Sequence, residues 1–235
     1  MEFLKTVFQS QDVLVKGLVR EPRLLICNSE KTLKPSLAFW KGWGFCGAEL
    51  VNFLKVNPAV LLHTSLTPAR VDLIHKIFPD NKGKMFKYIV NAATISCMET
   101  LEAKIENLKL CGLSTEETWQ LLRASPHVIF RSKEDVSEKM SILVNKMELP
   151  ATYVMQHPRL LNISLEKTMK PRCVVWQKIK SIDDSDLSLS RVLSMPEARF
   201  VRKIIKGHPE SKTLLKIYEN AISDASNCKK SSTKA

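Results

Sequence analysis

Hydrophobic residues recur along the chain at the spacing of amphipathic helices. Leu50, Phe53 and Leu54 form one such stripe, because residues three or four apart lie on the same face of a helix. Two further stripes are formed by Leu101, Ile105 and Leu108 and by Val136, Met140, Leu143 and Met147. Runs of alternating apolar and polar residues are few, and the chain has only seven glycines. The pattern predicts an all-α fold.

Part of this pattern is an internal repeat. Residues 20–41 read REPRLLICNSEKTLKPSLAFWK, and residues 156–177 read QHPRLLNISLEKTMKPRCVVWQ. Ten of the 22 positions are identical without a gap, and the residue numbers of the two segments differ by 136, which is four times 34. A repeat of about 34 residues predicts an array of helical units that share one continuous core.

Intermediate copies lie between these two segments. The shared core is an apolar residue, a proline four positions later and a second apolar residue three positions after that. It occurs at Leu18–Pro22–Leu25, Leu54–Pro58–Leu61, Leu122–Pro126–Ile129 and Val154–Pro158–Leu161. A degenerate copy without proline fits residues 89–95. About five copies are therefore expected, more than the roughly three that a stable array needs.

Each copy is predicted to contain two helices joined by a short turn. A helix has to end before Pro22, Pro58, Pro126 or Pro158, because proline lacks the N–H and disfavours helix in the residue before it. Pro35, Pro68 and Pro171 suit the first turn of the second helix, where the N–H is not needed.

Glycine and capping residues mark the boundaries between copies. Gly44 and Gly112 fit the left-handed position that ends a helix. Ser114, followed three residues later by Glu117, is a capping box that begins the next helix. These signals divide the chain at intervals that agree with the proline spacing.

The chain is expected to have four parts. Residues 1–180 form the repeat array, 181–190 a polar loop, 191–222 a C-terminal helical cap and 223–235 a disordered basic tail. The cap is predicted from its apolar positions, which are Val192, Leu193, Phe200, Ile204, Ile205, Leu214, Leu215 and Ile217.

The charge is strongly positive. Lys and Arg number 36 against 24 acidic residues, which gives a net charge of +12 and a pI of about 9.5. Such a charge attracts polyanions, so nucleic acid, ribosomes and anionic membrane surfaces are possible partners, beside the alternative of a protein that is simply basic. No run of 18 apolar residues is present, so no membrane-spanning helix is expected.

Catalytic and metal-binding signatures are absent from the sequence. There is no H-E-x-x-H, C-x-x-C, phosphate-binding loop or G-x-G-x-x-G motif. Asp183, Asp184 and Asp186 form an acidic run without matching ligands elsewhere. We therefore expect no catalytic residue, metal, cofactor or small-molecule substrate.

The repeat resembles the mitochondrial transcription termination factor (mTERF) family, in particular its plant organellar branch. The resemblance covers roughly residues 10–220 and is carried by the L-x-x-x-P-x-x-L core, the EKTLKP segment at residues 30–35 and the glycine turns. It implies copies of two α-helices and a 3₁₀ turn stacked into a curved α-solenoid. It also implies a location in mitochondria or chloroplasts and binding to duplex DNA or RNA.

The N-terminus departs from the family pattern. Residues 1–5 (MEFLK) do not have the Arg- and Ser-rich composition of a transit peptide, and the chain starts near the end of a copy. Family members carry a targeting peptide and usually more N-terminal copies. The expectation is a chain without a transit peptide and shorter than a typical member.

A curved solenoid would present one helix of each copy on its concave face, and basic residues at the repeat spacing could follow a phosphate backbone there. The residue numbers of Arg70, Lys104 and Lys139 differ by 34 and 35. Lys76 and Lys109 lie further along the same helices, and Lys178 is their expected counterpart in the last copy. A second cluster, spaced for one helix face, contains Arg199, Arg202, Lys203 and Lys206. The alternative for each residue is a solvated charge on the outer face.

Two functional hypotheses follow. The first is a monomeric nucleic-acid-binding regulator of organellar gene expression, acting in transcription termination or regulation or in intron splicing. The second is a protein-binding helical scaffold in organellar ribosome or splicing assemblies. A basic binding face favours the first, and an apolar or mixed-charge face favours the second.

Overall fold

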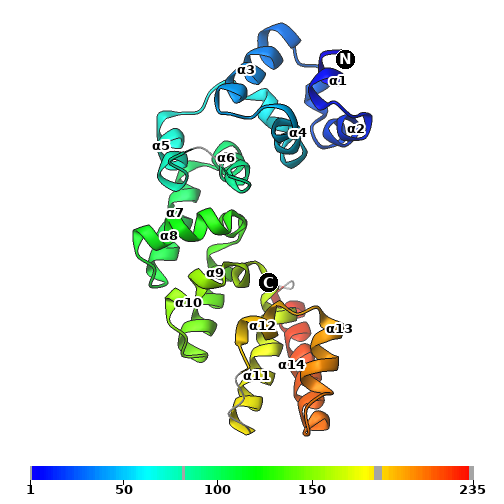
Figure 1. Cartoon of the computed structure of the whole chain (residues 1–235), viewed down its shortest axis with the longest axis vertical. Helices are drawn as coiled ribbons and strands as arrows, with labels where there is room; N and C mark the ends of the chain where they lie inside the picture. The colour runs from blue at the N-terminus through cyan, green and yellow to red at the C-terminus, as the bar shows by residue number, and fades with distance from the viewer. Residues whose placement is uncertain (1, 81–82, 183–186, 233–235) are drawn as a thin grey trace. The chain divides into compact units, whose positions relative to one another are not determined.

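The computed structural model describes residues 2–80, 83–182 and 187–232, with side chains as far as residue 224. Throughout these residues the regular structure is helical, and no strand occurs in them (Figure 1). The chain divides into two compact units, one of residues 1–106 and 118–130, the other of residues 107–117 and 131–235. The predicted all-α helical-repeat fold is confirmed.

The α-helices are α1 (Glu2–Phe8), α2 (Gln11–Arg20), α3 (Lys34–Gly42), α4 (Gly47–Val56), α5 (Pro68–Ile77), α6 (Phe86–Ile95), α7 (Met98–Leu110), α8 (Thr115–Ala124), α9 (Lys133–Ser141), α10 (Ala151–Gln156), α11 (Lys170–Ile182), α12 (Leu189–Ser194), α13 (Glu197–Phe200) and α14 (Ser211–Ser232). The 3₁₀ turns are η1 (Pro22–Leu25), η3 (Pro58–Leu62), η4 (Pro126–Phe130) and η6 (Pro158–Asn162). Four π-helical turns are η2 (Ser29–Leu33), η5 (Ile142–Lys146), η7 (Leu165–Met169) and η8 (Val201–Ile205).

The four repeat prolines end the first helices as predicted. Helices α2, α4, α8 and α10 each stop two residues before a proline, and each proline begins a 3₁₀ turn. Gly44 and Gly112 have φ values of 90° and 96°, the left-handed conformation expected at a helix end. In the capping box, the Ser114 N–H donates to Glu117 Oε2 at 2.8 Å, and the Glu117 N–H donates to Ser114 Oγ at 3.3 Å.

The three prolines lie in the first turns of the second helices, as predicted: Pro68 begins α5, and Pro35 and Pro171 are the second residues of α3 and α11. The sequence did not predict the π-turns η2 and η7, which precede α3 and α11. Asn28 caps η2 by accepting from two backbone N–H groups, and Ser164 caps η7 by accepting from the Lys167 N–H. A proline inside the first turns is tolerated because early N–H groups have no partner in the helix.

The degenerate copy differs from the others. Helix α6 continues from Phe86 to Ile95, so it occupies positions where the other copies have a 3₁₀ turn. No proline interrupts the backbone there, and the helix can therefore continue through Ala92.

The apolar stripes form the interior of each compact unit. All ten stripe residues identified in the sequence are buried. Trp40 is fully buried and its Nε1 donates to the Val60 carbonyl at 2.7 Å, while Trp176 Nε1 donates to the Leu187 carbonyl at 2.7 Å. These tryptophans occupy equivalent positions in the two matching segments, 20–41 and 156–177, and pack between elements.

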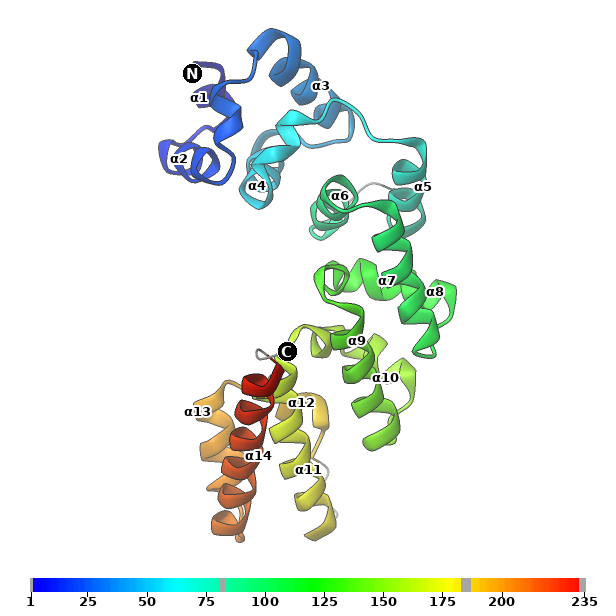
Figure 2. The same ribbon diagram turned by 180° about the vertical axis from the view of Figure 1, so that it is seen from behind.

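In the C-terminal part, α11 and α14 pack against each other and against α12 and α13. Helices α11, α13 and α14 lie side by side in both views (Figures 1 and 2). Its core contains Val175, Ile179, Val192, Phe200, Ile205, Leu214 and Tyr218. The predicted loop and tail need correction, because α11 runs to Ile182, α12 begins at Leu189 and α14 continues to Ser232. Residues 183–186, with the acidic run Asp183, Asp184 and Asp186, and residues 233–235 lie outside the described part.

Candidate nucleic-acid interface

A ladder of polar donors connects successive copies. Its members recur at the repeat spacing and are Ser36, Arg70, Lys104, Lys139 and Arg172. Each lies on the second helix of a copy or its first turns and donates to backbone carbonyls of the copy that follows. The contacts are Ser36 Oγ to the carbonyls of Val60 (3.0 Å) and His63 (2.7 Å), Arg70 Nη1 to Ala93, Lys104 Nζ to Ile129 (2.8 Å), Lys139 Nζ to Leu161 (2.9 Å) and Arg172 Nη1 to Met195 (2.6 Å).

The acceptors differ between copies: Ile129 and Leu161 lie in the 3₁₀ turns η4 and η6, the Val60 carbonyl in η3 also accepts from the His63 N–H, Ala93 lies in the last turn of α6, and Met195 follows α12. A short 3₁₀ turn pairs few of its own C=O groups, and a buried carbonyl without a partner is costly. A cation supplies a stronger hydrogen bond than a neutral donor does. The cations therefore recur at the repeat spacing because the packing contacts between successive copies recur at that spacing.

Lys139 was predicted to contact nucleic acid, and this prediction is wrong. Its side chain is 0% exposed, and its Nζ lies 2.6 Å from Asp135 Oδ2 in addition to its bond with the Leu161 carbonyl. Burial lowers the pKa of Lys139, and the hydrogen bond and charge of Asp135 oppose that shift. A phosphate cannot reach an ammonium group in this position.

Arg70 and Lys104 have the same structural role as Lys139, although their side chains are half-buried and not fully buried. Their donors point at carbonyls of the next copy, which corrects the expectation that they lie free on a binding face. The repeat spacing did identify equivalent positions. It could not distinguish side chains that face solvent from side chains that face the neighbouring copy.

The remaining members of the first predicted set are dispersed. Lys76 is exposed in the last turn of α5, within the first compact unit. Lys109 in α7 and Lys178 in α11 are half-buried and belong to the second unit. The contact of these three lysines with nucleic acid stays a prediction.

The four residues of the second predicted cluster lie on one exposed helical segment. Arg199 lies in α13, Arg202 and Lys203 lie in η8, and Lys206 caps the same continuous helical segment. All four are exposed, whereas Phe200 and Ile205 on the opposite face are buried. Within the described part of the chain, no ion pair or hydrogen bond engages any of these four side chains.

The surroundings of this cluster are also positive. Residues 191–216 contain seven Lys or Arg residues and two Glu residues, a difference of five positive charges. One of the two, Glu197, pairs with Arg172 Nη2 at 2.8 Å and accepts from Tyr218 Oη at 2.5 Å. Burial raises the pKa of Glu197, but the hydrogen bonds from Tyr218 and Arg172 lower it overall, so this carboxylate is ionised and its charge is compensated.

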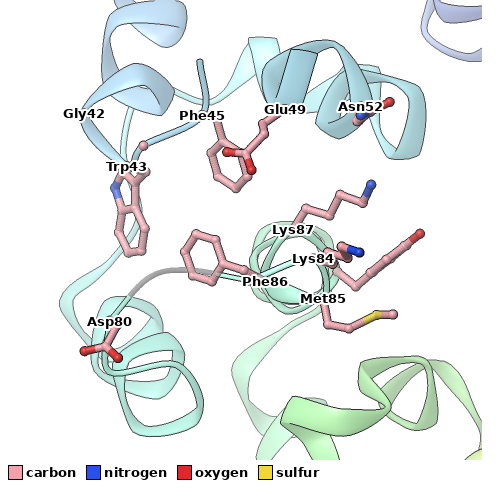
Figure 3. A pocket seen from close by; sticks show the side chains of 13 residues that line it. Gly42, Trp43, Phe45, Glu49, Asn52, Asp80, Lys84, Met85, Phe86 and Lys87 are labelled. Atoms are coloured by element: carbon pink, nitrogen blue, oxygen red, sulfur yellow. The ribbon is translucent and has the colours of Figure 1, made fainter. Parts of the chain in front are cut away.

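A pocket of about 910 Å³ lies in the first compact unit, between the α3–α4 junction and the start of α6. Figure 3 shows the rings of Trp43, Phe45 and Phe86 along one side of it. Phe45 and Phe86 are buried and stack with their centroids 5.5 Å apart, so they belong to the core of the unit. The charged residues that line the pocket are of both signs, with Glu49 and Asp80 beside Lys84 and Lys87. A lining of this kind does not favour the binding of a polyanion.

Sequence reasoning missed two ladder residues. Ser36 lies one repeat length before Arg70, and Arg172 lies about one repeat length after Lys139, so the repeat spacing could have found both. Arg172 is only 2% exposed and makes the most extensive contacts of the ladder.

Metal sites and membrane spans are absent from the described residues. No group of three or more His, Cys, Asp or Glu residues there could hold a metal ion. None of the described helices has both the length and the apolar character needed to cross a bilayer.

Comparison with known proteins identifies the repeat. The mTERF family model matches residues 1–201. Transcription termination factor MTERF8, chloroplastic, of Arabidopsis thaliana is 24% identical over 202 residues, which cover 85% of this chain and 40% of that protein. Transcription termination factor MTERF15, mitochondrial, of the same plant is 22% identical over 213 residues, which cover 89% of this chain and 47% of that protein. The chain thus spans less than half of the length of each relative, and it belongs to the mTERF family.

Proposed function

We propose that this protein is a nucleic-acid-binding, non-enzymatic regulator of organellar gene expression, acting in transcription termination or regulation or in intron splicing. The observation that carries the proposal is the cluster of Arg199, Arg202, Lys203 and Lys206, which is exposed, cationic and free of ion-pair partners among the described residues. We call these four residues the α13–η8 cluster.

The cluster suits a phosphate backbone for electrostatic reasons. Cations at positions i, i+3, i+4 and i+7 of one helical segment project from a single face, at spacings comparable with those between phosphates. Each phosphate that is neutralised releases condensed counterions, so the affinity depends steeply on salt. Such contacts orient the protein on nucleic acid and carry little sequence information.

The relatives support the organellar setting. One is named as a chloroplastic and the other as a mitochondrial transcription termination factor. We extend to this chain the regulation of transcription in an organelle, with duplex DNA or RNA as the ligand and a monomer as the binding species.

The test is fluorescence anisotropy of the purified chain with labelled duplex DNA and with single-stranded RNA across a range of salt concentrations. The variant replaces all four cluster residues by Glu. For duplex DNA we expect the slope of log K against log salt to become shallower by about three to four, near 0.9 for each lost phosphate contact. The ligand that binds more tightly to the unmodified chain distinguishes a DNA role from an RNA role.

A matched variant controls for net charge. It replaces Lys16, Lys31, Lys41 and Lys55 by Glu, four exposed lysines of the first unit, and so changes the charge of +12 by the same amount. Equal losses in the two variants would show that only total charge matters and would contradict the cluster. Absence of binding by the unmodified chain at low salt would overturn the proposed function.

A further inference from the structure

The α13–η8 cluster lies on a helical segment that is too short to be stable by itself. Helix α13 has four residues and the π-turn η8 that continues it has five. Isolated helices of fewer than about 12–15 residues are marginal in water, because the first turn fixes several residues for one hydrogen bond. Contacts with other helices therefore have to hold the segment, and they also decide where its cations point.

Glu197, the first residue of α13, is held from two other helices. Its Oε2 accepts from Arg172 Nη2 of α11 at 2.8 Å, and its Oε1 accepts from Tyr218 Oη of α14 at 2.5 Å. The two donors are 2% and 3% exposed, so packing fixes both of them in place. The carboxylate thus joins α11, α13 and α14, which lie side by side (Figures 1 and 2).

The same two donors hold the residues on either side of Glu197. Arg172 Nη1 donates to the Met195 carbonyl at 2.6 Å, and the guanidinium lies 4.5 Å from the centroid of the Phe200 ring. The rings of Phe200 and Tyr218 have their centroids 5.2 Å apart. Because Phe200 is fully buried, the opposite face of the segment, with the four cations of the cluster, is exposed. These contacts fix the rotation of the segment about its axis as well as its position.

The charge of Glu197 by itself opposes the binding of phosphates. This residue lies two positions before Arg199, and its side chain is 57% exposed. A carboxylate beside a cationic surface repels an approaching phosphate. Glu210, the other acidic residue between positions 191 and 216, is also exposed but takes no part in the contacts that hold α13.

We propose that Glu197, held by Arg172 and Tyr218, is the positioning residue of the α13–η8 cluster. It contacts no phosphate itself, but it orders the segment so that the four cations face the nucleic acid. This inference rests on the proposed function, in which the cluster is the contact surface. The order that the two hydrogen bonds give to the segment offsets the repulsion between the carboxylate and phosphate.

Glu197→Ala tests the inference against a matched variant, Glu210→Ala. Each substitution removes one negative charge and so raises the net charge of +12 by one. Electrostatic attraction alone would therefore make both variants bind nucleic acid more tightly. We expect Glu197→Ala to bind at least about threefold more weakly in fluorescence anisotropy, because the apparent Kd rises as the fraction of chains with an ordered cluster falls. Glu197→Gln keeps the side-chain length and one acceptor oxygen, and its affinity should lie between those of Ala and Glu.

Limited digestion with trypsin measures the order of the segment without nucleic acid. Trypsin cleaves after Lys and Arg, so the cluster itself provides the reporter bonds, and cleavage there requires local opening. Loss of hydrogen bonds to a charged group should raise the rate of cleavage after Arg199, Arg202 and Lys203 about tenfold in Glu197→Ala. The rate after Lys41, an exposed residue of the first compact unit, should stay the same and shows that the variant has not unfolded globally.

The two measurements distinguish failure of this inference from failure of the proposed function. Equal cleavage rates at the cluster in Glu197→Ala and Glu210→Ala would overturn the inference, whether or not the chain binds nucleic acid. Faster cleavage in Glu197→Ala, with an affinity equal to that of Glu210→Ala, would also overturn it, because the order of the segment would then not matter for binding. Absence of binding by the unmodified chain would overturn the proposed function and with it the role of Glu197 in binding, while the cleavage rates would still show whether Glu197 orders α13.

Discussion

The ladder cations and the α13–η8 cluster contain the same kinds of side chain in opposite environments. Lys139 and Arg172 are 0% and 2% exposed, and their donors bind backbone carbonyls and a carboxylate. Arg202 and Lys203 are exposed on a helical segment whose opposite face is buried. The ladder cations recur with the repeat, whereas the cluster occurs once, where the array ends in a different packing.

This difference separates cations that contact the protein's own backbone from cations that are available on the surface. A cation that repeats with the period of the packing is expected at the packing interface, because the neighbouring copy presents backbone carbonyls there in each repeat. A group of cations that breaks the period and lacks partners among the described residues has no such structural explanation. Periodicity in a repeat protein is therefore an argument for a structural role as much as for a binding role.

Replacement of Arg172 by Ala should have the largest effect on stability. The guanidinium donates to the carbonyls of Val192 and Met195 and to Glu197, and it lies 4.5 Å above the Phe200 ring. Because the Glu197 side chain is 57% exposed, the main cost is that buried carbonyls lose their donor, at about 1–3 kcal/mol each in unfolding free energy. Arg202→Ala is the exposed counterpart and should change stability by less than about 0.5 kcal/mol.

The rate at which the Cys173 thiol is labelled measures the loss of stability near Arg172. Burial raises the pKa of the Cys173 thiol to about 12, so the folded protein holds it as an unreactive neutral thiol. Each loss of about 1.4 kcal/mol in stability should raise the labelling rate about tenfold when labelling requires opening. Equal labelling rates in the Arg172 and Arg202 variants would contradict the structural role of Arg172.

Lys139→Met should have an intermediate effect. Methionine fills much of the same volume, but it leaves the buried Leu161 carbonyl without its donor, at a cost of about 1–3 kcal/mol. Urea unfolding followed by circular dichroism should detect the change. Nucleic-acid affinity under folding conditions should stay the same. A loss of affinity in a variant that remains folded would show that Lys139 does contact nucleic acid.

Tyr218→Phe should have the smallest effect, visible mainly at high pH. Burial, with the hydrogen bond to Glu197, raises the pKa of Tyr218 to about 12, whereas an unfolded tyrosine titrates near 10. Between these values the folded state binds more protons than the unfolded state, so this residue makes stability fall as pH rises from about 10 to 12. The variant should show a weaker decline when the urea midpoint is measured over that range, and an unchanged decline would show that Tyr218 is not held protonated.

Much of the fold was readable from the sequence. The prolines at 22, 58, 126 and 158 end the first helices because proline removes an N–H and restricts the residue before it, wherever it lies in the protein. Gly44, Gly112 and the Ser114–Glu117 pair act through equally local chemistry. The π-turns before Pro35 and Pro171 were missed because their caps, Asn28 and Ser164, gave only a weak signal in the sequence.

The sequence by itself determined the repeat period, the helix boundaries at proline and glycine, the apolar stripes and the total positive charge, since each depends on neighbouring residues or on composition. It also placed Arg70, Lys104 and Lys139 at equivalent positions. Only the tertiary structure decided that these side chains, with Ser36 and Arg172, donate to carbonyls of the next copy, and that Arg199, Arg202, Lys203 and Lys206 are exposed. The direction in which a long cationic side chain points depends on which carbonyls and apolar surfaces lie beside it, and residues distant in sequence supply those surfaces.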